Sequence, residues 1–477
     1  MQFLIPLSRR RQPLSRQVYA GLRQAILTGT FRAGDRLPST RDLAEQLGIS
    51  RTVVVTAYAQ LYAEGFAAGR AGSGTYVPAT LSPARPPGSR GSSRVRLSRY
   101  GSFASAAGAT IVFPKPREKP LRYDFAYGRS VVDCFPFDQW QRILNRRARQ
   151  IRVRELDYGP AAGSDTLREA IAGHLRRSRA VVCDSSQVLV VSGSQQALDL
   201  IVRVLIEPGD AAVVEDPIYQ GTREIVRVAG ARVHAVAVDR DGLDPESLPD
   251  KARIVFVTPS HQYPSGAILP LARRQALLDW ARRRNALIVE DDYDGEFRYD
   301  GKPLESLQGL DTEGRVIYVG TFSRTVFSSL RIGYLVVPRS LLPALTAAKW
   351  LSDRHTPTLE QETLAEFIGS GLYERHLRRV RRRNAATRRA LLDAVAEHLG
   401  DRVEVTGDGA GAHIVLWPEK RISEEDAVAA AAARRVGVYG IGGYFSKRPA
   451  RPGLILGYPR LREADIREGV RRLAEVL

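Results

Sequence analysis

The spacing of the hydrophobic positions changes along the chain and divides it into four predicted segments. Near the N-terminus apolar residues recur at about every fourth position, the period of an amphipathic helix, at Leu14, Val18, Leu22 and Ile26. From residue 123 onwards strand-like apolar runs alternate with helical runs. The predicted segments are a helical domain at 13–78, a Pro/Gly/Ser-rich linker at 79–122, a large α/β domain at 123–339 and a smaller α+β domain at 340–477.

The alternation in the large segment predicts a mostly parallel central sheet with helices on both faces. Ligands of such sheets bind at the C-terminal ends of the strands, so the polar motifs that follow these runs are the candidate site. Beyond residue 340, long helices at about 358–399, a strand at 414–417 and an Ala-rich helix at 424–435 indicate the smaller domain. The predicted strands of the large segment are 188–191, 211–214, 253–257, 286–289, 316–319 and 332–337, and its helices include 166–176, 195–206 and 272–284.

The N-terminal segment has the pattern of three helices in close succession. Ser39 is the predicted N-cap of a short helix at 40–47, and Gly48 ends that helix. Ser50 is the predicted cap of a third helix at 51–64. Two helices joined by a glycine turn form the plan of helix-turn-helix proteins, in which the second helix reads the major groove of DNA.

The charge of the chain favours an anionic partner. The formal net charge is +19 and the pI is near 10.2, which indicates nucleic acid first and an acidic membrane surface second. The linker contains many arginines and lysines but one acidic residue, Glu118. Because like charges repel one another, we expect this linker to be extended. Two cysteines make neither a disulfide framework nor a metal site, and the N-terminal residues predict neither a secretory signal nor a membrane span. We therefore expect a cytoplasmic protein without a membrane partner.

Two stretches of the N-terminal segment resemble the winged helix-turn-helix domain of the GntR regulator family. They are LPSTRDLAEQLGISR at 37–51 and GSGTYV at 72–77, where the second is a predicted turn and strand, the wing. Arginine can bind a guanine edge or a phosphate, and glycines let a backbone approach the sugar-phosphate chain. The alternative is a basic helical domain whose arginines are only solvated. The resemblance implies contacts to double-stranded DNA from Arg41, Ser50, Arg51, Thr52, Gly72, Ser73 and Gly74.

Polar motifs follow several predicted strands of the large segment. Ser194 and Gln195 open a helix whose free backbone N–H groups favour a phosphate. Tyr219 places a flat ring at a strand end, and the turn at 259–266 is rigid and polar. Asp291 belongs to three acids that come directly after an apolar strand, where a carboxylate needs a cation or a proton. Taken singly, these motifs also fit an ordinary strand-helix turn, a packed aromatic ring and an exposed acidic turn.

The order and spacing of these polar motifs resemble those of the aminotransferase-like domain of the MocR subfamily of GntR regulators. The resemblance extends from the Tyr-Gly-Pro motif at 158–160 to Pro338 and more loosely to the C-terminus. The fold so implied is that of fold-type I enzymes that depend on pyridoxal 5'-phosphate. The resemblance implies that Asp291 pairs with the pyridine nitrogen, Tyr293 reaches the 3-hydroxyl and Tyr219 stacks on the ring. It also implies a phosphate site at Ser194 and Gln195 with Thr321 or Ser323, and a phosphate or carboxylate contact from Arg331.

The sequence departs from this family pattern at Arg324. Residues 320–324 read Gly-Thr-Phe-Ser-Arg, where the family has the Schiff-base lysine at the last position. A guanidinium stays protonated and does not condense with an aldehyde under ordinary conditions, so we expect no covalent attachment of the cofactor and little or no transamination. The cofactor would then bind non-covalently or be absent, and the substitution could be natural or engineered. Arg324 could pair with the cofactor phosphate or with a ligand carboxylate.

A second departure lies at 453–457, where the family's substrate-carboxylate arginine is expected and the strand is apolar; Arg451 and Arg460 only flank it. We therefore predict a sequence-specific transcription regulator rather than an enzyme. Its aminotransferase-like domain would sense pyridoxal phosphate, an amino-compound or both, and the resemblance implies a homodimer. The alternatives are an aminotransferase with a DNA-binding head, and a regulator that uses the domain only for dimerisation.

Overall fold

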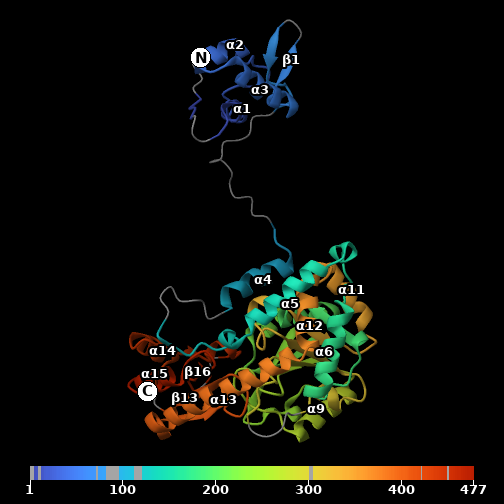
Figure 1. Cartoon of the computed structure of the whole chain (residues 1–477), viewed down its shortest axis with the longest axis vertical. Coiled ribbons are helices and arrows are strands. Elements are labelled where there is room, and N and C mark those ends of the chain that lie inside the picture. The colour runs from blue at the N-terminus through green and yellow to red at the C-terminus, as the bar shows by residue number, and fades with distance from the viewer. Residues whose placement is uncertain are drawn as a thin grey trace. The chain divides into compact units, whose positions relative to one another are not determined.

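The computed structural model describes residues 5–8, 12–70, 73–81, 96–111, 121–299, 305–419, 422–447, 449 and 451–477. The chain divides into two compact units, residues 1–96 and 97–477 (Figure 1). None of the helices in these ranges is long and apolar enough to span a bilayer.

The first unit is a helix-turn-helix domain with a two-stranded wing. Its helices enclose an apolar core built from residues such as Val18, Leu43, Val54 and Leu61. The two strands pair antiparallel, with Ala68 opposite Tyr76. The elements are α1 (Leu14–Leu27), α2 (Thr40–Leu47), α3 (Arg51–Ala63), β1 (Ala68–Arg70) and β2 (Gly74–Tyr76).

Of the two predicted N-cap serines in this unit, Ser39 forms its capping hydrogen bond and Ser50 does not. The Ser39 hydroxyl accepts a hydrogen bond from the Asp42 N–H at 3.1 Å, and Gly48 ends α2 in the left-handed conformation with φ 62°. Ser50 occupies the N-cap position of α3, but its side chain makes no capping hydrogen bond, so the predicted cap is wrong in this respect. Its hydroxyl is therefore not engaged by the helix N-terminus.

Part of the predicted linker is helical. Residues Arg99–Thr110 form α4, which begins at Ser98, whose hydroxyl accepts from the Gly101 N–H at 3.0 Å. The helix packs against α8 (Gln220–Val228) within the second unit, and the Arg203 guanidinium lies 6.0 Å from the Tyr100 ring centre. The expected extended connector is therefore wrong for these residues. Small residues and glycines hide the helix in the sequence, because they give little hydrophobic periodicity.

The second unit is built on a mixed sheet of eight strands among the described residues, in the order β4-β11-β10-β9-β8-β5-β6-β7. The central strands β10, β9, β8, β5 and β6 pair parallel, and β11 pairs antiparallel with both β10 and β4. The mostly parallel sheet predicted from the alternation is thus confirmed. The strands are β4 (Val188–Val191), β5 (Ala211–Asp216), β6 (Arg232–Asp239), β7 (Gly242–Leu243), β8 (Ile254–Val257), β9 (Leu287–Asp292), β10 (Val316–Thr321) and β11 (Gly333–Val336).

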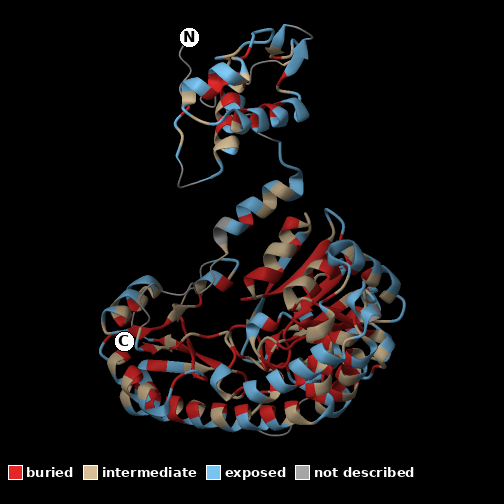
Figure 2. Ribbon diagram, turned by 45° about the horizontal axis from the view of Figure 1, so that its top comes forward, coloured by how far each residue is buried: buried red, intermediate tan, exposed pale blue. Residues whose placement is uncertain are grey.

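Helices cover both faces of this sheet, and the buried residues concentrate in the strands and on the inner sides of the helices (Figure 2). One face packs on α6 and α12, and the other on α7. The helices are α5 (Phe137–Gln150), α6 (Asp165–Ser178), α7 (Ser194–Leu205), α9 (Leu271–Arg284), α10 (Leu307–Leu310), α11 (Leu342–Asp353), α12 (Thr358–Gly369) and α13 (Leu372–His398). Short 3-10 turns are η1 (Val132–Cys134), η2 (Val153–Leu156), η3 (Ser185–Gln187), η4 (Pro245–Ser247), η5 (Ser328–Leu330), η6 (Gly400–Arg402) and η7 (Gly442–Tyr444).

A smaller lobe follows, with its own apolar core. Its described strands form an antiparallel sheet in the order β12-β13-β16-β15, and a short parallel pair joins β14 to β3. The elements are β3 (Tyr123–Asp124), β12 (Val403–Thr406), β13 (His413–Pro418), α14 (Glu424–Ala433), β14 (Val436–Gly437), β15 (Tyr439–Gly440), β16 (Leu454–Gly457) and α15 (Glu463–Leu473).

The division between the two lobes does not follow the order of the sequence. Tyr123 and Phe125 belong to the core of the smaller lobe, whereas Leu364 and Phe367 of α12 belong to the core of the larger one. Helix α13 runs from one lobe to the other (Figure 1). The boundary between the larger and the smaller lobe therefore lies within α13 and not at residue 340, because helices that follow residue 340 still pack against the large sheet.

Candidate functional site

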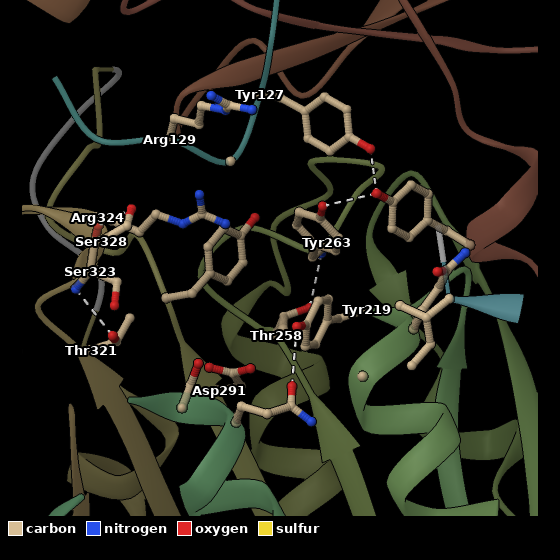
Figure 3. Close-up of a pocket in the computed structure, with 18 of the residues that line it drawn as sticks. Tyr127, Arg129, Tyr219, Thr258, Tyr263, Asp291, Thr321, Ser323, Arg324 and Ser328 are labelled. Atoms are coloured by element: carbon tan, nitrogen blue, oxygen red, sulfur yellow. Dashed lines mark hydrogen bonds between the residues drawn. The ribbon is translucent and has the colours of Figure 1, made fainter. Parts of the chain in front are cut away.

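A cavity of about 540 Å³ lies where β8, β9 and β10 end and where α7 and α8 begin (Figure 3). This is the edge at which ligands of parallel α/β sheets bind. The sequence placed nine residues in a cofactor site, and the cavity wall contains all of them: Ser194, Gln195, Tyr219, Asp291, Tyr293, Thr321, Ser323, Arg324 and Arg331. Their roles toward a ligand stay predictions.

One end of the cavity is a helix N-terminus prepared for an anion. Gly193 precedes α7 with φ 86° and ψ 171°, a conformation that is essentially restricted to glycine. The Arg331 guanidinium donates to the Ser192 carbonyl at 2.8 Å, and a Cβ on Gly193 would lie 2.9 Å from its Nη2. Arg331, Ser194 and the free N–H groups of the first turn therefore lie together, where the helix dipole favours negative charge.

The loop after β10 adds hydroxyl groups to this end. The Thr321 hydroxyl accepts from the Ser323 N–H at 3.1 Å. The Ser323 hydroxyl is buried and has no hydrogen-bond partner among the described residues. A buried hydroxyl without a partner is costly, so Ser323 is suited to an oxygen-rich ligand.

The three acids at the end of β9 have three different environments. Glu290 accepts from the backbone N–H groups of Leu307 and Gln308, each at 2.9 Å. Asp292 is buried against Arg179, whose Nε donates to it at 2.7 Å. Asp291 faces the cavity instead, and its buried Oδ1 has no partner in the described parts of the chain. Burial, reinforced by the charge of Asp292, raises the pKa of Asp291 to about 7.

Two aromatic residues of the predicted site are held by polar contacts. The Tyr219 hydroxyl donates to the Gln195 Oε1 at 3.1 Å. The Tyr293 hydroxyl lies 2.9 Å from His261 Nδ1, which is also 3.1 Å from Asp294 Oδ2. The sequence singled out His261 only as part of a polar turn, since nothing local shows that this ring meets Tyr293.

Arg324 extends into the cavity from the turn after β10 (Figure 3). Its guanidinium carbon lies 6.0 Å from the centre of the Tyr293 ring. On its other side is Gly128, where an added Cβ would lie 3.0 Å from the Arg324 Nη1. Within the described structure this guanidinium has no hydrogen bond and no acidic partner.

Further residues line the cavity besides the nine predicted ones, and of these the sequence indicated Tyr263 only as part of the turn at 259–266. The hydroxyls of Tyr127 and Tyr263 both bond to the hydroxyl of Tyr444, the second at 3.4 Å. Burial raises the pKa of all three tyrosines, so they remain neutral hydroxyls. They come from distant parts of the chain and have no common local signal. The other additional lining residues are Ile111, Gly128, Arg129, Gln220, Gly221, Thr258 and Ser328.

The first unit presents the residues predicted to contact DNA. Arg41 on α2, Ser50 before α3, and Arg51 and Thr52 on its first turn are all exposed. Arg51 Nε lies 3.4 Å from the Thr40 hydroxyl. Ser73 and Gly74 are exposed at the wing, and Gly74 has φ 115°, whereas Gly72 lies outside the described residues. Arg36 packs on Gly74 and was not singled out from the sequence.

Family models match both units. Residues 14–77 match the bacterial regulatory proteins of the gntR family, and residues 135–473 match aminotransferase class I and II. A probable rhizopine catabolism regulatory protein, MocR of Rhizobium meliloti, is 39% identical over 97% of this chain and 93% of its own. The chain belongs to the MocR-type regulators of the GntR family.

Other MocR-type regulators and aminotransferases support the assignment. The HTH-type transcriptional regulator TauR of Rhodobacter capsulatus is 34% identical over 95% of this chain and 94% of its own. The second unit is also similar to the structure of LysN, an alpha-aminoadipate aminotransferase of Thermus thermophilus in complex with N-(5'-phosphopyridoxyl)-L-leucine. The TM-score is 0.71 at 30% identity, and the match covers 80% of this chain and 98% of that enzyme. This MocR-type chain is therefore a helix-turn-helix transcriptional regulator with a fold-type I aminotransferase-like domain, which confirms the predicted fold and family.

Proposed function

We propose that this regulator binds double-stranded DNA through the N-terminal end of α3 and the wing, and that a ligand in the aminotransferase-like cavity controls this binding. The exposed side chains of Arg41, Arg51 and Thr52 support the DNA contact, because arginine reads guanine and binds phosphate. Control by the ligand requires a different ligand affinity in two states of the protein.

Fluorescence anisotropy with the DNA upstream of its own gene, over a range of salt concentrations, tests this contact. Arg51→Ala should weaken specific binding by about 1–3 kcal/mol, as expected for a base-reading arginine. The matched variant Arg16→Ala, which removes an exposed arginine from α1, should leave specificity unchanged. Equal affinity of the unaltered protein for operator and random DNA would refute the proposal.

We also propose that the cavity binds pyridoxal 5'-phosphate without a covalent bond. The unpartnered Asp291 carboxylate supports this because a protonated pyridine nitrogen supplies the cation that it lacks. The unpartnered Ser323 hydroxyl, the α7 N-terminus and Arg331 would hold the phosphate, and Tyr219 would cover the ring. When bound, the cofactor supplies an aldehyde that reacts with amines.

The residues around the cofactor site support sensing rather than turnover. None of the described residues that line the cavity is a lysine, and Arg324 stands where the family has one. A guanidinium stays protonated and is a poor proton carrier, so it holds charge and does not move a proton. Equilibrium dialysis with pyridoxal phosphate should show saturable, reversible binding, and a panel of amino acids should show no transaminase turnover. Turnover that depends on the cofactor would favour the enzyme instead.

The exposed surface of the second unit supports a homodimer. Tyr158, Trp350 and Leu351 are exposed by 72%, 49% and 78%, and the Arg354 guanidinium lies 4.5 Å from the Tyr158 ring and 5.0 Å from the Trp350 ring. Exposed apolar groups of this size favour burial against a second copy, and two half-sites on DNA require two recognition helices. Light scattering should report a dimer for the full chain, and Leu351→Glu should weaken it; a monomer at micromolar concentration would contradict this.

A further inference from the structure

The cavity wall has more positive than negative charge. Its described lining contains the guanidinium groups of Arg129, Arg324 and Arg331 but one carboxylate, Asp291. Arg331 is held by the Ser192 carbonyl at the α7 N-terminus. The charge of Arg324 is left without an acid in the described structure, and a partly buried cation of this kind is stabilised by an anion.

The backbone that carries Arg324 is fixed in place. The carbonyl of the next residue, Thr325, accepts from His376 Nε2 at 2.7 Å, and its hydroxyl accepts from the Tyr373 hydroxyl at 2.9 Å. Both partners are buried residues of α13. A guanidinium presented from a fixed backbone loses less entropy on binding, so Arg324 is suited to ligand recognition.

The direction of Arg324 separates it from the phosphate end of the cavity. Its guanidinium lies between Gly128 and the Tyr293 ring, and in the view of Figure 3 the side chain extends into the cavity with Arg129 above it and Asp291 below it. Arg331, in contrast, lies at the α7 N-terminus. The two arginines therefore occupy different parts of the cavity wall.

The strand expected to carry a carboxylate-binding arginine cannot supply one. On β16 the central residue Ile455 is fully buried, in a cluster with Tyr127, Tyr263 and Tyr444. Arg451, which precedes the strand, donates to the Trp417 carbonyl at 2.7 Å and pairs with Glu404. Neither residue is available to an anion in the cavity.

We propose that Arg324 is the carboxylate receptor of the effector, so that the effector is a compound with both an amino and a carboxylate group. This rests on the proposed sensing function of the cavity. A planar guanidinium matches a carboxylate through two parallel hydrogen bonds, which a lysine cannot provide. The substitution thus exchanges a reactive amine for a recognition group, and it replaces the arginine absent from β16.

Isothermal titration of the full chain saturated with pyridoxal phosphate tests this with acid and amine pairs. The pairs are 4-aminobutyrate with propylamine, L-alanine with ethylamine, and L-phenylalanine with 2-phenylethylamine. At least one acid should bind about tenfold or more tightly than its amine, as expected for a charged hydrogen-bonded pair. Arg324→Gln should bind the members of that pair equally while it retains pyridoxal phosphate.

Two further variants exclude a general loss of structure. Arg324→Met keeps the length of the side chain without its charge and should give the same loss of preference as Arg324→Gln. Arg16→Gln, in the other unit, should keep the preference of the unaltered protein. Amines that bind as tightly as every acid, or a preference that survives Arg324→Gln, would overturn the inference. Failure of pyridoxal phosphate to bind at all would instead refute the proposed function.

Discussion

Asp291 and Arg324 face the same cavity, yet the two side chains form no ion pair in the described structure. Burial raises the pKa of Asp291 to about 7, and the Arg324 guanidinium opposes this rise without cancelling it. Each charge of this pair therefore lacks a close partner of its own. A ligand with a cationic nitrogen near Asp291 and an anionic group near Arg324 satisfies both.

Replacing Asp291 by Asn should weaken the binding of pyridoxal phosphate by at least about tenfold. The amide keeps the shape of the side chain but removes the negative charge that would stabilise a protonated ring nitrogen. An absorbance titration measures the affinity. Asp241→Asn, an exposed carboxylate outside the cavity wall, is the control and should have no effect. An unchanged affinity in Asp291→Asn would show that Asp291 does not meet the ring.

The ligand-free protein should lose stability as the pH rises from about 4 to about 7. Burial raises the pKa of Glu215, Glu290 and Asp291 to about 7 each, above the values near 4 of unfolded chains. In this interval the native state retains protons that the unfolded state has released, so the free energy of unfolding falls with pH and then levels off. Asp291→Asn removes one contribution and should flatten the dependence. Urea unfolding midpoints from pH 5 to pH 8 measure it, and a slope of the opposite sign would contradict the account.

Gly193→Ala should lower both stability and the affinity for pyridoxal phosphate. At φ 86° and ψ 171° a side chain costs about 1–3 kcal/mol, and the new methyl group would lie 2.9 Å from Arg331 Nη2. Gly108→Ala is the control, because a Cβ there meets nothing within 4 Å in helix α4 and should stabilise by about 0.5–1 kcal/mol. Thermal unfolding and a titration with the cofactor separate the two effects. Equal behaviour of the two variants would mean that the α7 N-terminus is not strained as described.

Ile111→Ser should weaken ligand binding and also alter the effect of the ligand on DNA affinity. Ile111 lines the cavity and directly follows α4, the helix nearest in sequence to the DNA-binding unit. Its apolar side chain loses stabilising burial when it becomes a hydroxyl. Operator affinity with and without saturating ligand measures the coupling. If the variant binds ligand more weakly but ligand saturation changes its operator affinity as in the unaltered protein, Ile111 contacts the ligand without contributing to the coupling.

Regular strands and local motifs were predictable from the sequence, and contacts between distant residues were not. The run 188–191 coincides with β4 because a strand that is buried on both faces reads as a continuous apolar run. Strand β6 was missed, since most of its side chains are exposed or half-buried and they form no apolar run. Helix α4 was missed for a related reason, because its small residues carry no amphipathic period.

The candidate site also contains residues that local motifs predict and contacts between distant residues that they do not. Asp291 was recognisable because an acid after a buried strand needs a partner. Only the packing shows that its neighbours bind elsewhere, Glu290 to the Leu307 N–H and Asp292, through Oδ2, to Arg179. The contact between Tyr127 and Tyr444 joins residues 317 positions apart, and no local pattern announces it. Distant packing of this kind forms the part of the cavity wall that contains Tyr127, Tyr263 and Tyr444.

Intact mass after incubation with pyridoxal phosphate and reduction with borohydride tests the central claim most directly. Borohydride fixes a cofactor only where a lysine has condensed with its aldehyde. We predict that the unaltered protein keeps its mass while dialysis shows reversible binding, and that Arg324→Lys, the positive control, gains one phosphopyridoxyl group. A phosphopyridoxyl adduct on a specific lysine of the unaltered protein would contradict the account, and so would a complete absence of binding.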